Sequence, residues 1–214
     1  MEIAKRSFEY SKSIIDTLKK NWKSIIFLFL FTFGILLGTY ILKQNHDFTS
    51  TTLANILNEY ISLKRGNTIL DNFIASFKVN FIFVLLTFML GFCAIGTPFI
   101  TLVPVIKGIG MGLFCGYLYL NYNFSGLGYC VLIIYPGLII SLFALLSASN
   151  FSLSFSYEML LSLFGTNNTK KKNLGAEHQL KIFCIRYIII FIISIIGSIV
   201  DSLTIKLFSG LFNF

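Results

Sequence analysis

The feature that most constrains this chain is a run of 50 consecutive residues, between Lys107 and Glu158, without a Lys, Arg, Asp or Glu. As one helix the run would be about 75 Å long, whereas the hydrocarbon core of a bilayer is about 30 Å thick. The run must therefore turn. Its most polar stretch, Asn121–Gly126, combines Asn, Ser and Gly and predicts that turn, with one membrane span on either side.

Three further uncharged or nearly uncharged runs are long enough to cross a bilayer. They cover residues 24–42, residues 79–106 with a span at about 81–102, and residues 183–200. Hydrophobic residues make up 56% of the chain and charged residues 12%, which excludes an ordinary soluble domain. The sequence predicts an all-α, polytopic helical membrane protein with about five transmembrane helices and an external amphipathic helix.

Three prolines are expected to kink these helices because proline lacks a backbone donor. They are Pro98 and Pro104 in the second span and Pro136 in the fourth. The second span is therefore predicted to end in a turn at Pro104–Gly108. Residues Phe151–Phe164 stay apolar after the fourth span, and we interpret them as a helix extension or an interfacial segment.

The predicted organisation has six parts. They are a basic cytoplasmic N-terminal segment (1–23), a first transmembrane helix (24–42), an extracytoplasmic amphipathic segment (43–80), a core of three transmembrane helices (81–164), a basic cytoplasmic loop (165–182) and a last transmembrane helix with an external tail (183–214).

The positive charges support five spans. With five, 12 of the 17 Lys and Arg residues lie on the side of the N-terminus, including Lys107 and the triple lysine Lys170–Lys172. The positive-inside rule then places that side in the cytoplasm. A sixth crossing by residues 151–164 would put the triple lysine outside, against the rule.

Two patterns indicate packing surfaces. Apolar residues at helical spacing in the external segment predict an amphipathic helix that is a candidate partner contact. Glycines four residues apart predict close helix packing, as small residues do between membrane helices. The first set is Leu53, Ile56, Leu57, Tyr60 and Ile61, and the second is Gly108, Gly112 and Gly116 with Gly34 and Gly38.

The sequence offers no recognisable catalytic, metal or cofactor site. Its two histidines, His46 and His178, fall on opposite predicted sides of the membrane without a nucleophile or second ligand nearby. Lys107, Arg186 and Asp201 are expected near span ends, so the spans are expected to lack deep charges of the kind that transport paths use. A noncatalytic protein without cofactors follows.

The stretch Phe73–Leu118 carries a set of short motifs: Leu90-Gly91, Ile95-Gly96-Thr97-Pro98, Lys107-Gly108, and Gly112 with Gly116. In this respect the chain resembles the stage II sporulation protein M family. The resemblance implies a membrane anchor that localises a peptidoglycan-remodelling complex at the sporulation septum during engulfment, with a lytic transglycosylase and an amidase/endopeptidase as partners. A homo-oligomer is compatible with this role, whereas no nucleic acid is expected as a partner.

A different class of function stays open at this stage, namely a permease-like component of a transporter, because the same motifs occur in a broader set of membrane proteins.

Overall fold

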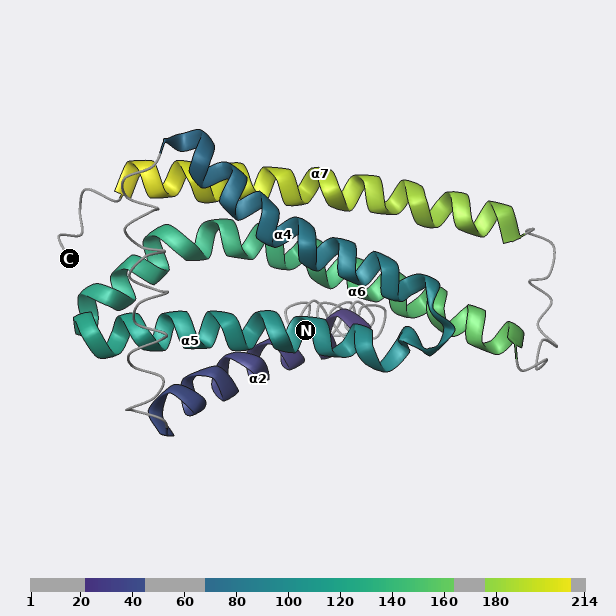
Figure 1. The fold of residues 1–214 in the computed structure, drawn as a ribbon, viewed down its shortest axis with the longest axis horizontal. Coiled ribbons are helices and arrows are strands. Elements are labelled where there is room, and N and C mark those ends of the chain that lie inside the picture. The colour runs from purple at the N-terminus through teal and green to yellow at the C-terminus, as the bar shows by residue number, and fades with distance from the viewer. Residues whose placement is uncertain (1–21, 45–67, 164–175, 209–214) are drawn as a thin grey trace, which may run out of the picture.

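The computed structural model describes residues 22–44, 68–163 and 176–208, and within them it consists of helices and short connections (Figure 1). In chain order the elements are α2 (Trp22–Gln44), α4 (Ile69–Phe92), the 3-10 turn η1 (Ala94–Gly96), α5 (Thr97–Tyr129), the π-helical turn η2 (Cys130–Ile134), α6 (Tyr135–Leu163) and α7 (Ala176–Phe208).

Among the described residues, four continuous helical stretches are long and apolar enough to cross a membrane: Trp22–Gln44, Ile69–Phe92, Ala94–Leu161 and His178–Phe208. The third, at 68 residues, is far longer than one crossing needs. Figure 1 shows α5 and α6 running in opposite directions, so this stretch is folded back on itself. The predicted all-helical membrane fold with about five spans is confirmed.

The reversal within the long stretch lies at Asn123, inside the predicted turn. Its backbone angles are φ 49° and ψ −129°, the one positive φ among non-glycine residues in the described part of the chain. Asparagine tolerates positive φ better than most residues do. The chain therefore reverses at Asn123, within the turn predicted at Asn121–Gly126.

The turn predicted at Pro104–Gly108 is wrong, because the chain turns earlier, at Cys93–Gly96. There α4 ends at Phe92 and α5 starts at Thr97. Pro98 lies in the first turn of α5, where its missing donor costs no intrahelical bond. Pro104 lies inside α5, and the helix continues past it.

The third proline, Pro136, follows the π turn η2, in which the Tyr135 N–H bonds to the Cys130 carbonyl. A wider turn of this kind is a recognised source of helix bending. After it, α6 continues without a break to Leu163, so residues from Phe151 onward extend the fourth span rather than cross the membrane again. The further turn that a sixth crossing by residues 151–164 would need is absent from α6 over its described length, Tyr135–Leu163.

The start of α4 shows that the helix reaches into the segment predicted to be external. Thr68 caps it: the Thr68 hydroxyl accepts from the Asp71 N–H, and the Asp71 carboxylate accepts from the Thr68 N–H. This reciprocal arrangement satisfies two backbone N–H donors at the start of the helix. The predicted amphipathic contact residues, 53–61, lie outside the described residues.

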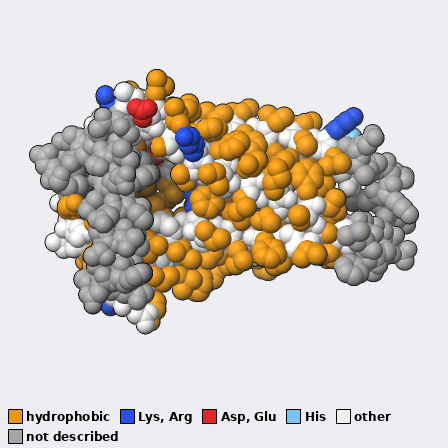
Figure 2. Space-filling model, viewed as in Figure 1, with side chains coloured by type: hydrophobic (Ala, Val, Ile, Leu, Met, Phe, Trp, Pro, Cys, Tyr) orange, Lys and Arg blue, Asp and Glu red, His pale blue; other side chains and the backbone are white. Residues whose placement is uncertain are grey.

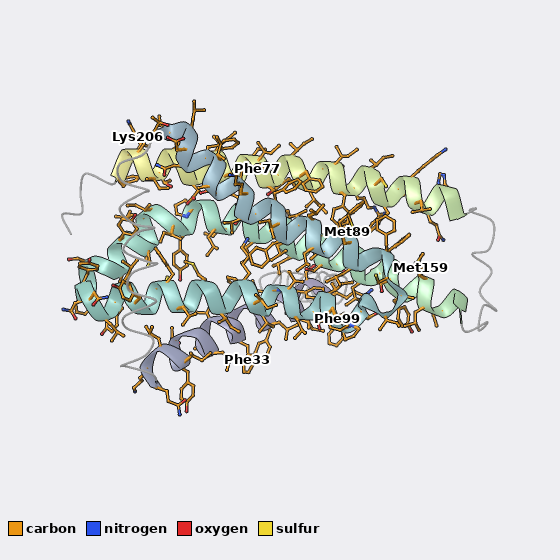
Figure 3. The ribbon with its side chains drawn as sticks, viewed as in Figure 1. Phe33, Phe77, Met89, Phe99, Met159 and Lys206 are labelled. Carbon is orange, nitrogen blue, oxygen red and sulfur yellow. The ribbon has the colours of Figure 1, made fainter. Side chains whose placement is uncertain are left out.

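The outer surface of the bundle is apolar. Figure 2 shows hydrophobic side chains covering the middle of the face in view, and Figure 3 shows such side chains pointing away from the helices. Phe33, Met89 and Phe99, labelled in Figure 3, are 47%, 56% and 53% exposed. Large apolar residues exposed all round a bundle mark a surface that faces lipid.

The Asn123 turn yields a stability prediction. The Asn123→Gly variant should unfold at higher temperature, because glycine relieves backbone strain of about 1–3 kcal/mol at such angles. The matched control is Asn121→Gly, which lies in regular helix and should lower stability by about 0.5–1 kcal/mol. Thermal unfolding of the purified protein in detergent measures both, and equal shifts in the same direction would contradict the strain at Asn123.

Candidate functional site

The predicted glycine positions lie where α2 crosses α5. A Cβ atom added to Gly34 would lie 3.1 Å from the Gly108 Cα, and one added to Gly108 would lie 3.1 Å from the Gly34 Cα. At Gly38 it would lie 3.0 Å from the Leu113 N, and at Gly112 it would lie 3.0 Å from the Ile35 Cα. The two backbones therefore touch along this crossing, and only glycine permits it.

At Gly116, the last residue of the predicted ridge, the nearest neighbours are side-chain atoms. An added Cβ there would lie 3.0 Å from Leu42 Cδ2 and 3.6 Å from Thr39 Cγ2. Gly110, on the same helix, meets nothing within 4 Å. The close contact is thus specific to one face of α5.

The second candidate site is a cavity of about 360 Å³ inside the bundle, on another part of α5. Its polar lining comes from four helices: Ser76 and Asn80 on α4, Lys107 on α5, Ser141 on α6 and Asp201 on α7.

Lys107 is the central residue of this cavity, and its position corrects the prediction that it lies at a span end. It is 9% exposed and lies about 15 Å along α5 from the start of the helix, near the middle of a bilayer. Its Nζ donates to Asn80 Oδ1 at 3.2 Å and to Ser141 Oγ at 3.3 Å, and lies 5.7 Å from the centre of the Phe83 ring.

The carboxylate of Asp201 lines the same cavity and attracts Lys107 electrostatically. The Ser76 hydroxyl donates to Asp201 Oδ2, and the Asn80 amide donates to Ser198 Oγ at 3.2 Å. Ser76 and Asn80 are one turn apart on α4, so the contacts form two levels. We call Ser76, Asn80, Lys107, Ser141 and Asp201 the polar core.

Apolar clusters flank the polar core. One contains Leu118, Tyr129, Cys130, Ile133 and Ile205, toward the Asn123 turn. The other contains Val84, Ala144, Ala148, Phe183, Tyr187 and Ile190, with the rings of Phe88, Phe92 and Phe155 packed against it. The charged groups are therefore held in an apolar surrounding, where their attraction is much stronger than in water.

Two glycines that sequence reasoning missed bring Asp201 to this place. An added Cβ on Gly137 would lie 2.9 Å from the Asp201 Cα, and one on Gly197 would lie 3.1 Å from the Ser141 N. They let α6 and α7 approach backbone to backbone. The spacing of four between Gly137 and Ser141 on α6, and between Ser194, Ser198 and Ser202 on α7, is the small-residue signal that could have indicated this contact.

The described structure defines a polytopic helical membrane bundle in which Lys107 and Asp201 line an internal cavity and many large apolar residues are exposed on the outer surface. A comparison with known families matches residues 27–203 to the family Stage II sporulation protein M. Because the match covers most of the chain, the protein belongs to that family, as its motifs predicted. No curated protein and no solved structure matches the sequence significantly.

The glycine contact predicts a contrast between two neighbouring positions. Gly112→Leu should lower the protein's level in membranes and its unfolding temperature, because overpacking of this kind costs about 1–3 kcal/mol or more. Gly110→Leu is the matched control and should behave like the unchanged protein. Immunoblotting of membranes and thermal unfolding in detergent check both, and a well-folded Gly112→Leu protein would rule out the backbone contact.

The polar core predicts energetic coupling. Lys107→Gln and Asp201→Asn should each destabilise the protein, since either leaves a charge in the membrane interior, which costs about 3 kcal/mol. The double variant should lose less than the sum of the two, with a coupling energy of about 1–3 kcal/mol. Unfolding in mixed micelles measures the cycle, and strict additivity would show that the two charges do not interact.

Proposed function

We propose that this protein is a noncatalytic membrane scaffold that localises a peptidoglycan-remodelling hydrolase complex during sporulation engulfment. A lytic transglycosylase and an amidase/endopeptidase are its proposed partners. The observation that carries the proposal is the family match over residues 27–203. A scaffold acts by raising the local concentration of its partners at the membrane, which needs a rigid anchor rather than catalytic groups.

The structure supports the anchor part of this role. The backbone contact between α2 and α5 and the contact between α6 and α7 at Gly137 and Gly197 are both of the kind that fixes helices in a bilayer. The start of α2 is held against α6, since Lys23 Nζ donates to Ser154 Oγ at 3.2 Å and Asn150 Nδ2 donates to Ser24 Oγ at 3.3 Å. The helices thus form one body.

The orientation we propose has the N-terminus in the cytoplasm. Ser156 Oγ donates to the Cys93 carbonyl at 2.7 Å, so the α4–α5 turn and the end of α6 lie at the same end of the bundle as the start of α2. The opposite end joins α7 to the start of α4, where Ser202 Oγ donates to the Ile69 carbonyl at 2.8 Å. With Lys107 inside, 11 Lys and Arg residues belong to the first end and five to the second, which favours this orientation.

The proposed partner surface is on the second end and includes the segment from Lys43 to the start of α4. Its candidate contacts, Leu53, Ile56, Leu57, Tyr60 and Ile61, were predicted from helical spacing. An extracytoplasmic surface is required because the cell wall lies on that side of the membrane.

A labelling experiment tests the orientation. In a variant with the four native cysteines replaced by Ala, Lys206→Cys should react in intact cells with a maleimide that does not cross membranes, because Lys206 is in the last turn of α7. Restoring Cys93 alone should give a protein that reacts only after the membrane is permeabilised. The reverse pattern would overturn the proposed orientation.

The scaffold role is tested by crosslinking the tagged protein in sporulating cells and identifying what is recovered by mass spectrometry. Cell-wall hydrolases should be enriched over a tagged control membrane protein, and the substitution of Leu57 and Tyr60 by Ser should reduce their recovery at unchanged protein level. Recovery of an ATPase without a hydrolase would instead favour the permease-like alternative, to which the buried Lys107 lends one structural observation.

A further inference from the structure

We propose that the cavity around the polar core is a binding site for a small zwitterionic amphiphile, a molecule that carries an ammonium group, an anionic group and an apolar body. The cavity volume of about 360 Å³ falls in the range of small-molecule sites. This proposal requires neither the scaffold role nor transport, because binding to the purified protein involves neither hydrolases nor flux.

The anionic group of the ligand would bind Lys107. An ammonium has three N–H donors, and Lys107 uses two of them on Asn80 and Ser141 within the part of the chain that the structure describes. Both acceptors are neutral. A phosphate or carboxylate oxygen would therefore supply the third bond, and it would be a charge-assisted one of greater strength.

The ammonium group of the ligand would bind Asp201. This carboxylate already accepts from the Ser76 hydroxyl, but a carboxylate offers about four lone-pair sites and can accept more than one donor. The two binding groups are about one helical turn apart along the bundle, since Ser76 precedes Asn80 by four residues on α4. That separation suits an ammonium and an anion joined by a few bonds.

The charge balance of the cavity selects a zwitterion over a singly charged ligand. Lys107 and Asp201 together contribute no net charge in a surrounding of low dielectric constant. A ligand without net charge preserves that balance. A ligand with one net charge would leave an uncompensated charge in the membrane interior, which costs roughly several kcal/mol.

The walls and the opening of the cavity favour a ligand with an apolar body. Apart from the polar core, the lining consists mostly of apolar and aromatic side chains, among them Phe83 and Met111. Three lining residues are exposed on the lipid-facing surface between α4 and α5: Val79 at 48%, Ile106 at 54%, and Gly110. The cavity thus opens sideways, where a ligand with an apolar body can enter from the bilayer.

Two sources could provide this chemistry, namely the headgroup region of a zwitterionic phospholipid and a free apolar amino acid. Three probes separate them: short-chain phosphatidylethanolamine, leucine, and short-chain phosphatidylglycerol as a net-anionic comparison of the same size. Each is added to the full chain in neutral detergent, and the dissociation constant is obtained from the rise in unfolding temperature with ligand concentration.

The expected result is saturable binding of phosphatidylethanolamine, of leucine, or of both, with phosphatidylglycerol weaker by about tenfold or more, as the loss of a charge-assisted bond would cause. Equal binding of the two phospholipids, or no saturable binding of the zwitterions, would overturn the proposal.

Two variants localise the binding. Gly110→Phe should abolish it without unfolding the protein, because the added side chain fills the cavity opening where a Cβ meets no other atom within 4 Å. Gly110→Ala is its matched control and should bind normally. Lys107→Gln should weaken binding about tenfold or more, whereas Lys78→Gln, which changes an exposed lysine on α4, should not. Unchanged binding by Gly110→Phe would place any ligand elsewhere and refute this site.

Discussion

Every part of this structure depends on the absence of water in the bilayer core, where a polar group must find its partner inside the protein. The backbone meets this condition by being helical almost throughout the described residues. Many side-chain hydroxyls meet it by bonding to carbonyls, as Ser152 does to Thr87 O at 2.8 Å and Thr204 does to Ile133 O at 2.8 Å. The polar core is the extreme case, because there the groups to be satisfied carry full charges.

Glycine allows two pairs of helices to approach closely, and the two contacts have different consequences. At the α2–α5 crossing it allows two backbones to touch, and the contact is apolar. At the α6–α7 contact Gly137 lies directly against Asp201, so the close approach of the helices brings a carboxylate to the cavity that holds Lys107. The first contact packs α2 against the rest of the bundle, and the second builds the candidate site.

The features that could be predicted from sequence were those in which one short segment contains the whole signal. The reversal near Asn123 is such a case, since no bilayer accommodates 50 uncharged residues as one helix, and so is the glycine spacing on α5. The turn between α4 and α5 was misplaced because Pro104 and Gly108 look like a stronger break than Cys93–Gly96. In lipid, a proline inside a helix is tolerated.

That one displacement of the turn also hid the polar core. With a turn at residue 104, Lys107 lies at a membrane surface; with the turn at residue 94, it lies in the middle of the membrane. Its partners lie far away in the sequence: Asn80 is 27 residues from Lys107, Ser141 is 34 and Asp201 is 94. No local pattern contains such a site, because it exists only once four helices are assembled.

The two faces of α5 have a mechanical consequence. On one face α5 is joined to α2 by backbone contact, and on another it carries Lys107, which is bonded to α4 and α6. A load applied to the chain beyond the end of α2 at Gln44 therefore reaches α5 directly, without a flexible side chain in between. Because Lys107 on α5 is bonded to Asn80 and Ser141, a displacement of α5 would also move the side chains that line the cavity.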